Sequence, residues 1–171
     1  MATVPAPRAY CGRFDQSPIL VLKGQVRYVT ARTLRLFIDD LLARQPGDTL
    51  IIDLRELESI DSTGMGLLAH LGRTTLQHGR RAVIVCGVKD VMTCLRSAAF
   101  DTLFIIVERW PFPEEASVSE VPLDEGDLLP DIMGRLMLDA HRDLASLSEA
   151  NRQAFAGVIS ALASDLPDAG R

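Results

Sequence analysis

The residues best suited to chemistry lie where an apolar, strand-like run gives way to a helix. Asp61, Ser62 and Thr63 stand at this junction, and all three residue types are favoured at helix N-caps. A serine hydroxyl there could accept a phosphate, because unpaired backbone N–H groups and the positive end of the helix dipole stabilise added negative charge. The alternative is that these residues do no more than start a helix.

Two glycines, Gly64 and Gly66, follow in the first turn of the predicted helix. Each costs roughly 1 kcal/mol relative to alanine in a helix interior, so their presence needs a reason. Without side chains they would let the backbone of another protein approach closely. They would equally let the helix pack tightly against its own strands, and the sequence leaves both explanations open.

Catalysis by Ser62 would require a histidine base and an oxyanion hole. The three histidines are His70, His78 and His141, and Ile60 stands where a Gly-x-Ser-x-Gly elbow has its first glycine. We therefore expect no enzyme activity, and ordinary surface roles for His70 and His78. The sequence has no Walker loop, Rossmann glycine pattern or paired metal-ligand spacing, so we expect no cofactor and no metal.

The composition favours a folded protein that binds other proteins. Of 171 residues, 47% are hydrophobic and 24% are charged, which suits one domain with an appendage. The net charge of −5 argues against nucleic acid as a partner, because nucleic-acid binding depends on clustered Lys and Arg.

Cysteine usage and hydropathy bear on the compartment. Cys11, Cys86 and Cys94 lack CxxC spacing and are odd in number, which indicates reduced thiols. Residues 1–13 lack the apolar core of a signal peptide, and no apolar run approaches the roughly 20 residues that span a bilayer. We therefore expect a cytoplasmic protein without direct membrane insertion.

The elements that must position Ser62 alternate between strands and helices. Short apolar runs rich in β-branched residues predict strands, and helical spacing of apolar residues predicts helices between them. The predicted strands are 19–22, 50–54, 82–86 and 103–107, with a further antiparallel strand within 9–14, and the predicted helices are 30–43, 62–78 and 88–98. This pattern predicts an α/β fold with a mixed central sheet of about four to five strands and flanking helices.

The composition changes after this α/β region, which we place at residues 1–112. Residues 111–131 contain four prolines and seven acidic residues but no Lys or Arg, and we predict a linker over 113–131. Residues 132–171 form the third segment, a C-terminal helical extension. Its apolar stripes predict two amphipathic helices, on Ile132, Leu136, Ala140, Leu144 and Leu147 and on Ala154, Phe155, Val158, Ile159 and Leu162.

The predicted helical hairpin over 132–162 must bury its apolar stripes, because short isolated helices are marginal in water. We predict that Ser148 caps its second helix. The hairpin could dock on the α/β domain, on a partner or on a second copy of the chain. We expect at least partial docking on the domain, with a role in selecting the partner.

The segment around Ser62 resembles the signature of STAS-domain anti-sigma factor antagonists. The resemblance rests on the apolar strand that ends in Asp53-Leu54 and on the run Ile60-Asp61-Ser62-Thr63-Gly64-Met65-Gly66-Leu67-Leu68. It extends to Gly24 after the first long strand and covers about residues 19–107. It implies a STAS fold and a non-catalytic regulator that switches partners when a partner kinase phosphorylates Ser62. The implied partner-binding residues are Asp61, Ser62, Thr63, Gly64, Met65 and Arg27.

One departure points to a subgroup of that family. The chain has Gly24-Gln25-Val26-Arg27 where many relatives have Gly-Glu-Leu-Asp. A subgroup with a Val-Arg element and a C-terminal extension similar to 140–144 and 151–155 pairs with a response regulator that has kinase and phosphatase activities. The implied partners are such a regulator or an anti-sigma factor, with a second regulator bound in the other phosphorylation state. The alternatives are a STAS scaffold, a soluble subunit of a membrane transporter or signalling complex, and a metabolite sensor.

Overall fold

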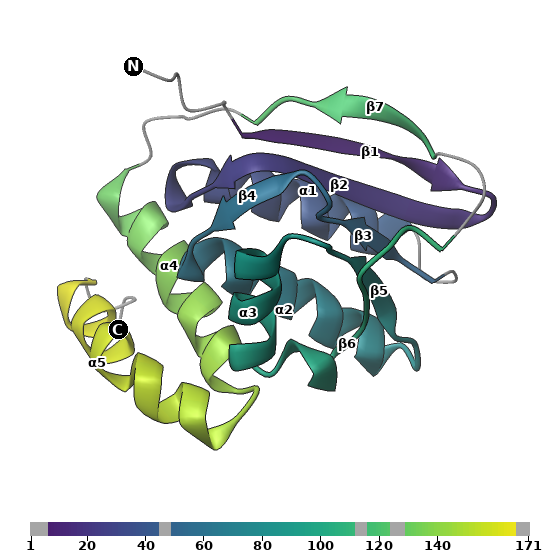
Figure 1. The fold of residues 1–171 in the computed structure, drawn as a ribbon. Coiled ribbons are helices and arrows are strands. Elements are labelled where there is room, and N and C mark those ends of the chain that lie inside the picture. Colours follow the sequence, from purple (N-terminus) through teal and green to yellow (C-terminus); the bar gives the residue numbers. More distant parts are fainter. Residues whose placement is uncertain (1–6, 45–48, 112–115, 124–128, 167–171) are drawn as a thin grey trace, which may run out of the picture.

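The computed structural model describes residues 7–44, 49–111, 116–123 and 129–166, and it has a mixed sheet flanked by helices (Figure 1). The strands run in the order β6-β5-β3-β2-β1-β7, and β4 pairs with the end of β2. Neighbours from β2 to β6 are parallel, whereas β1 is antiparallel to both β2 and β7. The strands are β1 (Arg8–Phe14), β2 (Ser17–Val26), β3 (Ile51–Asp53), β4 (Leu57–Ile60), β5 (Ala82–Val85), β6 (Phe104–Val107) and β7 (Ser117–Val121).

Five α-helices and two short 3₁₀ helices lie within the described residues. The α-helices are α1 (Ala31–Arg44), α2 (Ser62–Gln77), α3 (Lys89–Ser97), α4 (Pro130–Ala145) and α5 (Glu149–Asp165). The 3₁₀ helices are η1 (Tyr28–Thr30), which enters α1, and η2 (Phe100–Thr102), which precedes β6. This order confirms the predicted α/β alternation and the predicted helical hairpin at the C-terminal end of the chain.

The sheet has seven strands, so the prediction of about four to five was too low. The two strands outside the predicted set are β4, which lies between the predicted strand 50–54 and the predicted helix 62–78, and β7, which lies inside the predicted linker 113–131. β4 has two exposed residues, and every residue of β7 is exposed or half-buried. Neither strand therefore shows the apolar run that marks a buried strand.

Successive side chains of the central strands point to opposite faces of the sheet, and on each face they enter a different hydrophobic cluster. Leu20, Leu22 and Ile52 point into the main core, which contains apolar residues of α1, α2 and α3. Ile19 and Ile51 point into a smaller cluster on the other face, where Phe14 and Trp110 pack. The helices thus cover one face of the sheet, and a small apolar cluster closes the other.

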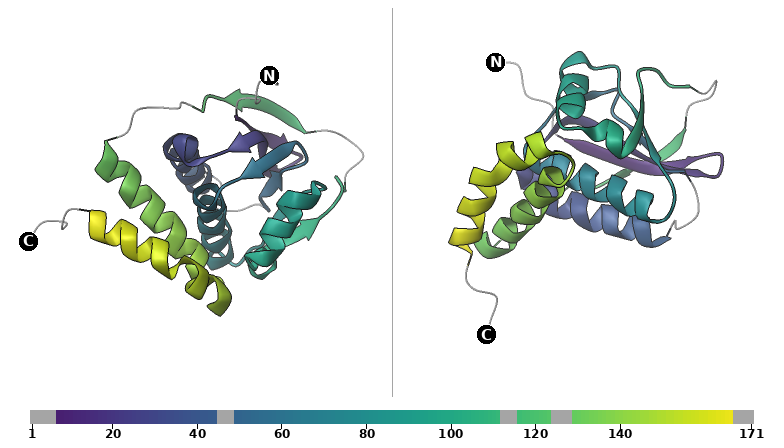
Figure 2. Two further views of the ribbon diagram at one scale, coloured as in Figure 1. Left: turned by 60° about the vertical axis from the view of Figure 1, so that its left-hand side comes forward. Right: turned by 90° about the horizontal axis from the view of Figure 1, so that it is seen from below.

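The C-terminal helices lie against the α/β domain, on the helix that begins with Ser62 (Figure 2). Helix α4 packs along α2, and α5 packs along α4 at the outside of the molecule. The expected docking of the hairpin on the domain is therefore observed. Ser148 caps α5 as predicted, because its side chain accepts a hydrogen bond from the N–H of Asn151 at 3.1 Å. Within the described ranges, no helix combines the length and apolar character needed to cross a membrane.

Candidate functional site around Ser62

Helix α2 begins at Ser62, and Asp61 is its N-cap. The backbone of Asp61 is extended, and its Oδ1 accepts a hydrogen bond from the N–H of Gly64 at 2.8 Å. Its other oxygen, Oδ2, accepts from the N–H of Tyr28 at 2.7 Å, at the start of η1. One carboxylate thus joins the starts of η1 and α2, and the Ser62 side chain is not needed to cap the helix.

The Ser62 hydroxyl contacts a histidine from the C-terminal hairpin. Its Oγ lies 2.9 Å from Nε2 of His141 on α4. The other ring nitrogen, Nδ1, lies 2.7 Å from the carbonyl oxygen of Met137, which can only accept a hydrogen bond. In the neutral ring Nδ1 therefore carries the hydrogen and Nε2 is an acceptor, so the hydroxyl of Ser62 donates to His141.

Contacts with both helices of the hairpin hold the His141 ring in place. Its side chain is 3% exposed, and the ring of Phe155 on α5 packs edge-on against it with 5.7 Å between ring centroids. Nδ1 is fixed to its own helix through Met137. Both helices of the hairpin therefore position the nitrogen that accepts from Ser62.

The two glycines of the first turn have different explanations in the structure. A Cβ added at Gly64 would lie 2.8 Å from Cγ1 of Ile60 and 3.0 Å from Cγ1 of Val26, so this glycine allows close packing on the strand ends. A Cβ added at Gly66 would lie 2.2 Å from the carbonyl oxygen of Ala140. The backbone that approaches Gly66 therefore belongs to α4 of the same chain.

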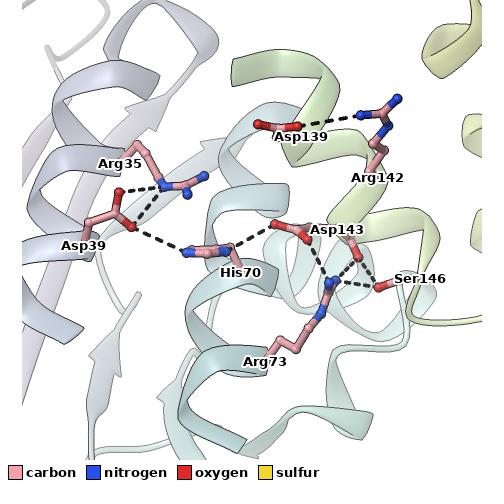
Figure 3. A network of polar contacts seen from close by, with 8 residues as sticks. All are labelled: Arg35, Asp39, His70, Arg73, Asp139, Arg142, Asp143 and Ser146. Atoms are coloured by element: carbon pink, nitrogen blue, oxygen red, sulfur yellow. Dashed lines mark hydrogen bonds and ion pairs between the residues drawn. The ribbon is translucent and has the colours of Figure 1, made fainter. Parts of the chain in front are cut away.

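A polar network joins three helices one to two turns further along α2 (Figure 3). His70 lies between two carboxylates, with Nε2 3.4 Å from Asp39 on α1 and Nδ1 3.4 Å from Asp143 on α4. Arg73 pairs with Asp143 at 2.9 Å and donates to its backbone carbonyl and to Ser146. The expected surface role of His70 is wrong, because its side chain is 25% exposed and lies in the seam between α1, α2 and α4.

The remaining residues predicted to bind a partner differ in exposure. Arg27 is exposed and its Nη2 donates to Oε1 of Gln25 at 2.8 Å. Its chain neighbours bond to Asp61, because Asp61 N–H donates to the carbonyl of Val26 and Tyr28 N–H donates to the Asp61 carboxylate. Arg27 thus lies beside the Ser62 segment, as expected. Thr63 is 2% exposed and Met65 is 8% exposed, so both side chains are buried.

The contact between Ser62 and His141 differs from a Ser-His-Asp triad in the group that orients the histidine. The imidazole is oriented by the carbonyl of Met137 and not by a carboxylate, so an imidazolium formed in catalysis would lack an anionic partner. The N–H of Gly64, in the first turn of α2, already donates to Asp61. The arrangement instead buries a hydroxyl against a histidine and an α-helix.

Comparisons with known proteins agree with this architecture. A STAS domain model matches residues 13–118, which is more than half of the chain, and the chain therefore belongs to the STAS domain family. The match ends within β7, so α4 and α5 lie outside it. The comparison with curated proteins gave no match.

Two solved proteins have a similar fold. One is an anti-sigma factor antagonist from Mycobacterium paratuberculosis, with 21% identity and a TM-score of 0.51 over 61% of this chain and 87% of that one. The other is the protein TM1081 from Thermotoga maritima, whose NMR structure has 18% identity and a TM-score of 0.51 over 57% of this chain and 78% of that one. At these identities the likeness concerns the fold.

Sequence reasoning missed the pairing of Ser62 with His141, which is separated from it by 79 positions. The separate signals were present. Ala140 and Leu144 lie on the predicted stripe of α4, and Gly66 is a small residue on α2 that a close helix could use. Periodicity predicts which face of a helix is buried, but it does not say against which element that face packs.

Proposed function

We propose that this protein is an anti-sigma factor antagonist that switches partners when Ser62 is phosphorylated by a partner kinase and dephosphorylated by a partner phosphatase. The partner is an anti-sigma factor or a response regulator that has both activities, and a second regulator binds the other phosphorylation state. The protein itself is not an enzyme. It acts in the cytoplasm, without binding nucleic acid and without direct membrane insertion.

The observation that carries the proposal is the position of the Ser62 hydroxyl. It lies at the first residue of α2, beside the ends of β2 and β4, in a segment that resembles the phosphoacceptor segment of anti-sigma factor antagonists. Because Asp61 supplies the helix cap, loss of the Ser62 hydroxyl group to a phosphoester leaves the start of α2 intact. The fold of the domain can persist while the charge of this segment changes.

Phosphorylation would add a charge of about −1.5 to −2 directly beside the Asp61 carboxylate. A partner surface that carries Lys or Arg would gain affinity for the modified segment, and an acidic surface would lose it. We propose that residues 61–65, together with Arg27, form the partner-binding site, in which Asp61, Ser62 and Arg27 contact the partner and the buried Thr63, Gly64 and Met65 hold the segment in place. The Arg27 guanidinium, which now donates to the neutral side chain of Gln25, is the cation that we propose pairs with the phosphate.

Phosphosite mapping in the native cell tests this proposal. We expect one phosphorylated residue, Ser62, in protein captured from the cell and analysed by mass spectrometry, and no modification in Ser62→Ala. Ser59→Ala is the matched control, because Ser59 is an exposed serine of the preceding strand. Phosphate that persists on Thr63 or Ser59 in Ser62→Ala would show that the assignment of Ser62 is wrong.

Affinity capture tests the partner switch. Wild type, Ser62→Ala and Ser62→Asp should retain different proteins from the same lysate, with a sigma-factor regulator among those retained by at least one form. Identical captures by all three forms, or capture of a transporter ATPase in place of a regulator, would contradict the proposal.

A further inference from the structure

We propose that helix α4 is a displaceable cover over Ser62, and that docking of α4 and phosphorylation of Ser62 exclude each other. The closed chain shown in Figures 1 and 2 is then the form that a kinase cannot modify. The phosphorylation half of this inference rests on the proposed function. The cover itself is a property of the chain alone.

Helix α4 occupies the space beside the Ser62 hydroxyl that an incoming phosphoryl group needs. A kinase must bring the reacting phosphorus within about 3–3.5 Å of the acceptor oxygen along an open line of approach. The Ser62 Oγ is part-buried and has Nε2 of His141 at 2.9 Å, on a helix whose backbone touches α2 at Gly66. A kinase active site therefore cannot enclose this hydroxyl while α4 is docked.

A phosphorylated Ser62 cannot keep its present hydrogen bond to His141. A phosphoester oxygen has no hydrogen, so Ser62 would no longer donate to Nε2 of His141. The imidazole is 3% exposed and its Nδ1 is fixed by Met137, so the orphaned nitrogen cannot turn away to water. The 2.9 Å between Oγ and Nε2 also leaves no space for a phosphoryl group between the two atoms, so the docked contact is lost even if a phosphate oxygen could accept from the ring.

The backbones of α4 and α2 approach so closely that even a small outward shift of α4 would break their contact. At Gly66 the Ala140 carbonyl already lies where a Cβ would be, 2.2 Å from its position. Close packing of this kind accepts two discrete arrangements, contact or separation, more readily than a gradual displacement. The phosphate is therefore accommodated by release of the helix.

The contact between α2 and α4, which we call the seam, is of a kind that can separate. Besides the backbone approach at Gly66, it contains polar pairs, namely Ser62 with His141 and Asp143 with both His70 and Arg73. Toward the start of α4 the packing opens into a cavity of about 500 Å³ between η1 and the hairpin, lined by Tyr28, Val29, Met133, Gly134, Met137 and Leu162 among others. Release can begin at this loosely packed end and proceed toward His141.

Hydrogen–deuterium exchange on the full chain tests the cover without a kinase. In Ser62→Asp and in Gly66→Ala we expect amides of α4 and α5 to exchange at least tenfold faster than in wild type, whereas β2, β3 and β5 keep their protection. Ser59→Asp adds the same charge on an exposed strand residue, and Gly157→Ala adds the same methyl group where no atom lies within 4 Å. Both controls should exchange like wild type.

Unchanged exchange of α4 and α5 in Ser62→Asp would overturn the inference. Protection of the amides of the sheet shows that a variant is still folded. If Gly66→Ala loses this protection, the result for Ser62→Asp alone tests the inference. Failure of the two proposals is distinguishable. If Ser62 is never phosphorylated in the cell but Ser62→Asp releases the hairpin, the cover stands and the proposed function fails. If native phosphoprotein keeps wild-type protection in α4, the cover fails and the proposed function stands.

Discussion

The main core beneath the sheet and the seam between α2 and α4 are built on different principles. The core joins sheet and helices through aliphatic and aromatic side chains that are almost wholly buried, and Leu144 is the one described residue of the C-terminal hairpin among its buried members. The seam combines apolar packing, in which Leu136, Leu147 and Phe155 of the hairpin lie against that core, with hydrogen bonds and ion pairs, several of them part-exposed. Apolar burial is non-directional and strong in sum, whereas exposed polar pairs contribute little each.

The stability of the whole domain and the stability of the docked hairpin should therefore depend on different contacts. Loss of a core side chain should lower the stability of the whole domain, because every strand depends on the same cluster. Loss of a seam contact should loosen the hairpin and leave the sheet intact. Variants of the core and of the seam should therefore differ in which parts of the chain they destabilise.

Replacement of a core isoleucine should destabilise the whole domain. Ile52 is fully buried in the central strand β3, and we expect Ile52→Ala to lower the free energy of unfolding by about 2–5 kcal/mol. The matched control is Ile105→Ala on the edge strand β6, where the side chain is 47% exposed and the expected loss is about 1 kcal/mol or less. Urea denaturation followed by circular dichroism measures both. Equal midpoints for the two variants would remove the basis of the comparison.

Replacement of the buried amide of α5 should loosen the hairpin alone. Nδ2 of Asn151 donates to the carbonyls of Ala98 at 2.9 Å and of Leu144 at 3.0 Å, and the residue is 4% exposed. Asn151→Ala leaves both carbonyls without this donor, and we expect about 1–3 kcal/mol less protection of α5 in hydrogen exchange. The exposed Gln153→Ala is the control. A matching loss of protection in β2 and β3 would mean that core and seam unfold as one unit.

Removal of the charge at Asp143 should weaken the seam by a smaller, salt-dependent amount. Its carboxylate pairs with Arg73 at 2.9 Å and with His70 at 3.4 Å, and its side chain is 16% exposed. Because Arg73 is one-third exposed, we expect Asp143→Asn to reduce hairpin protection by about 1 kcal/mol at low salt and by less in 1 M salt. Asp139→Asn should change nothing measurable, since its 3.9 Å pair is exposed. A salt-independent effect would contradict the ionic explanation.

Thiol labelling should show no change in the core when the seam opens. Burial raises the pKa of the Cys86 thiol above its ordinary value, and the residue is fully buried in the main core. At neutral pH iodoacetamide should therefore label the exposed Cys94 well before Cys86, in wild type and in Gly66→Ala alike. Labelling of Cys86 should rise only as the pH approaches the raised pKa. Rapid Cys86 labelling in Gly66→Ala, measured by mass spectrometry, would show that the core opens with the seam.

Local sequence signals predicted the buried elements and missed the exposed ones. The predicted runs 19–22, 50–54, 82–86 and 103–107 contain β2, β3, β5 and β6 in whole or in part, because buried parallel strands are continuous apolar runs. β2 extends through Gly24, whose positive φ of 71° coincides with a register shift beside β4. β4 and β7 carry exposed polar residues, so only their hydrogen-bonded partners identify them as strands.

In the candidate site, too, the local features were predicted from the sequence and the long-range contact was missed. The cap position, the helix start and the place of Arg27 beside the Ser62 segment follow from residues close together in the sequence or on adjoining strand ends. The contact of Ser62 with His141 depends on how two helices pack across 79 positions of the chain, which no local pattern encodes. In the sequence His141 stands out as one of three histidines and as part of the segment 140–144 that carries the subgroup resemblance, and neither signal points to Ser62.

The pairing of β7 with β1 fixes how far a released hairpin can travel. β7 ends at Val121 and α4 begins at Pro130, so nine backbone steps of at most about 3.6 Å hold the start of α4 within about 30 Å of the sheet edge. A helix confined to that volume has an effective concentration on the order of millimolar at its own docking face. A regulator present at micromolar concentration would therefore be outcompeted roughly a thousandfold by the tethered helix unless it binds α2 more tightly or a phosphate on Ser62 weakens the helix first.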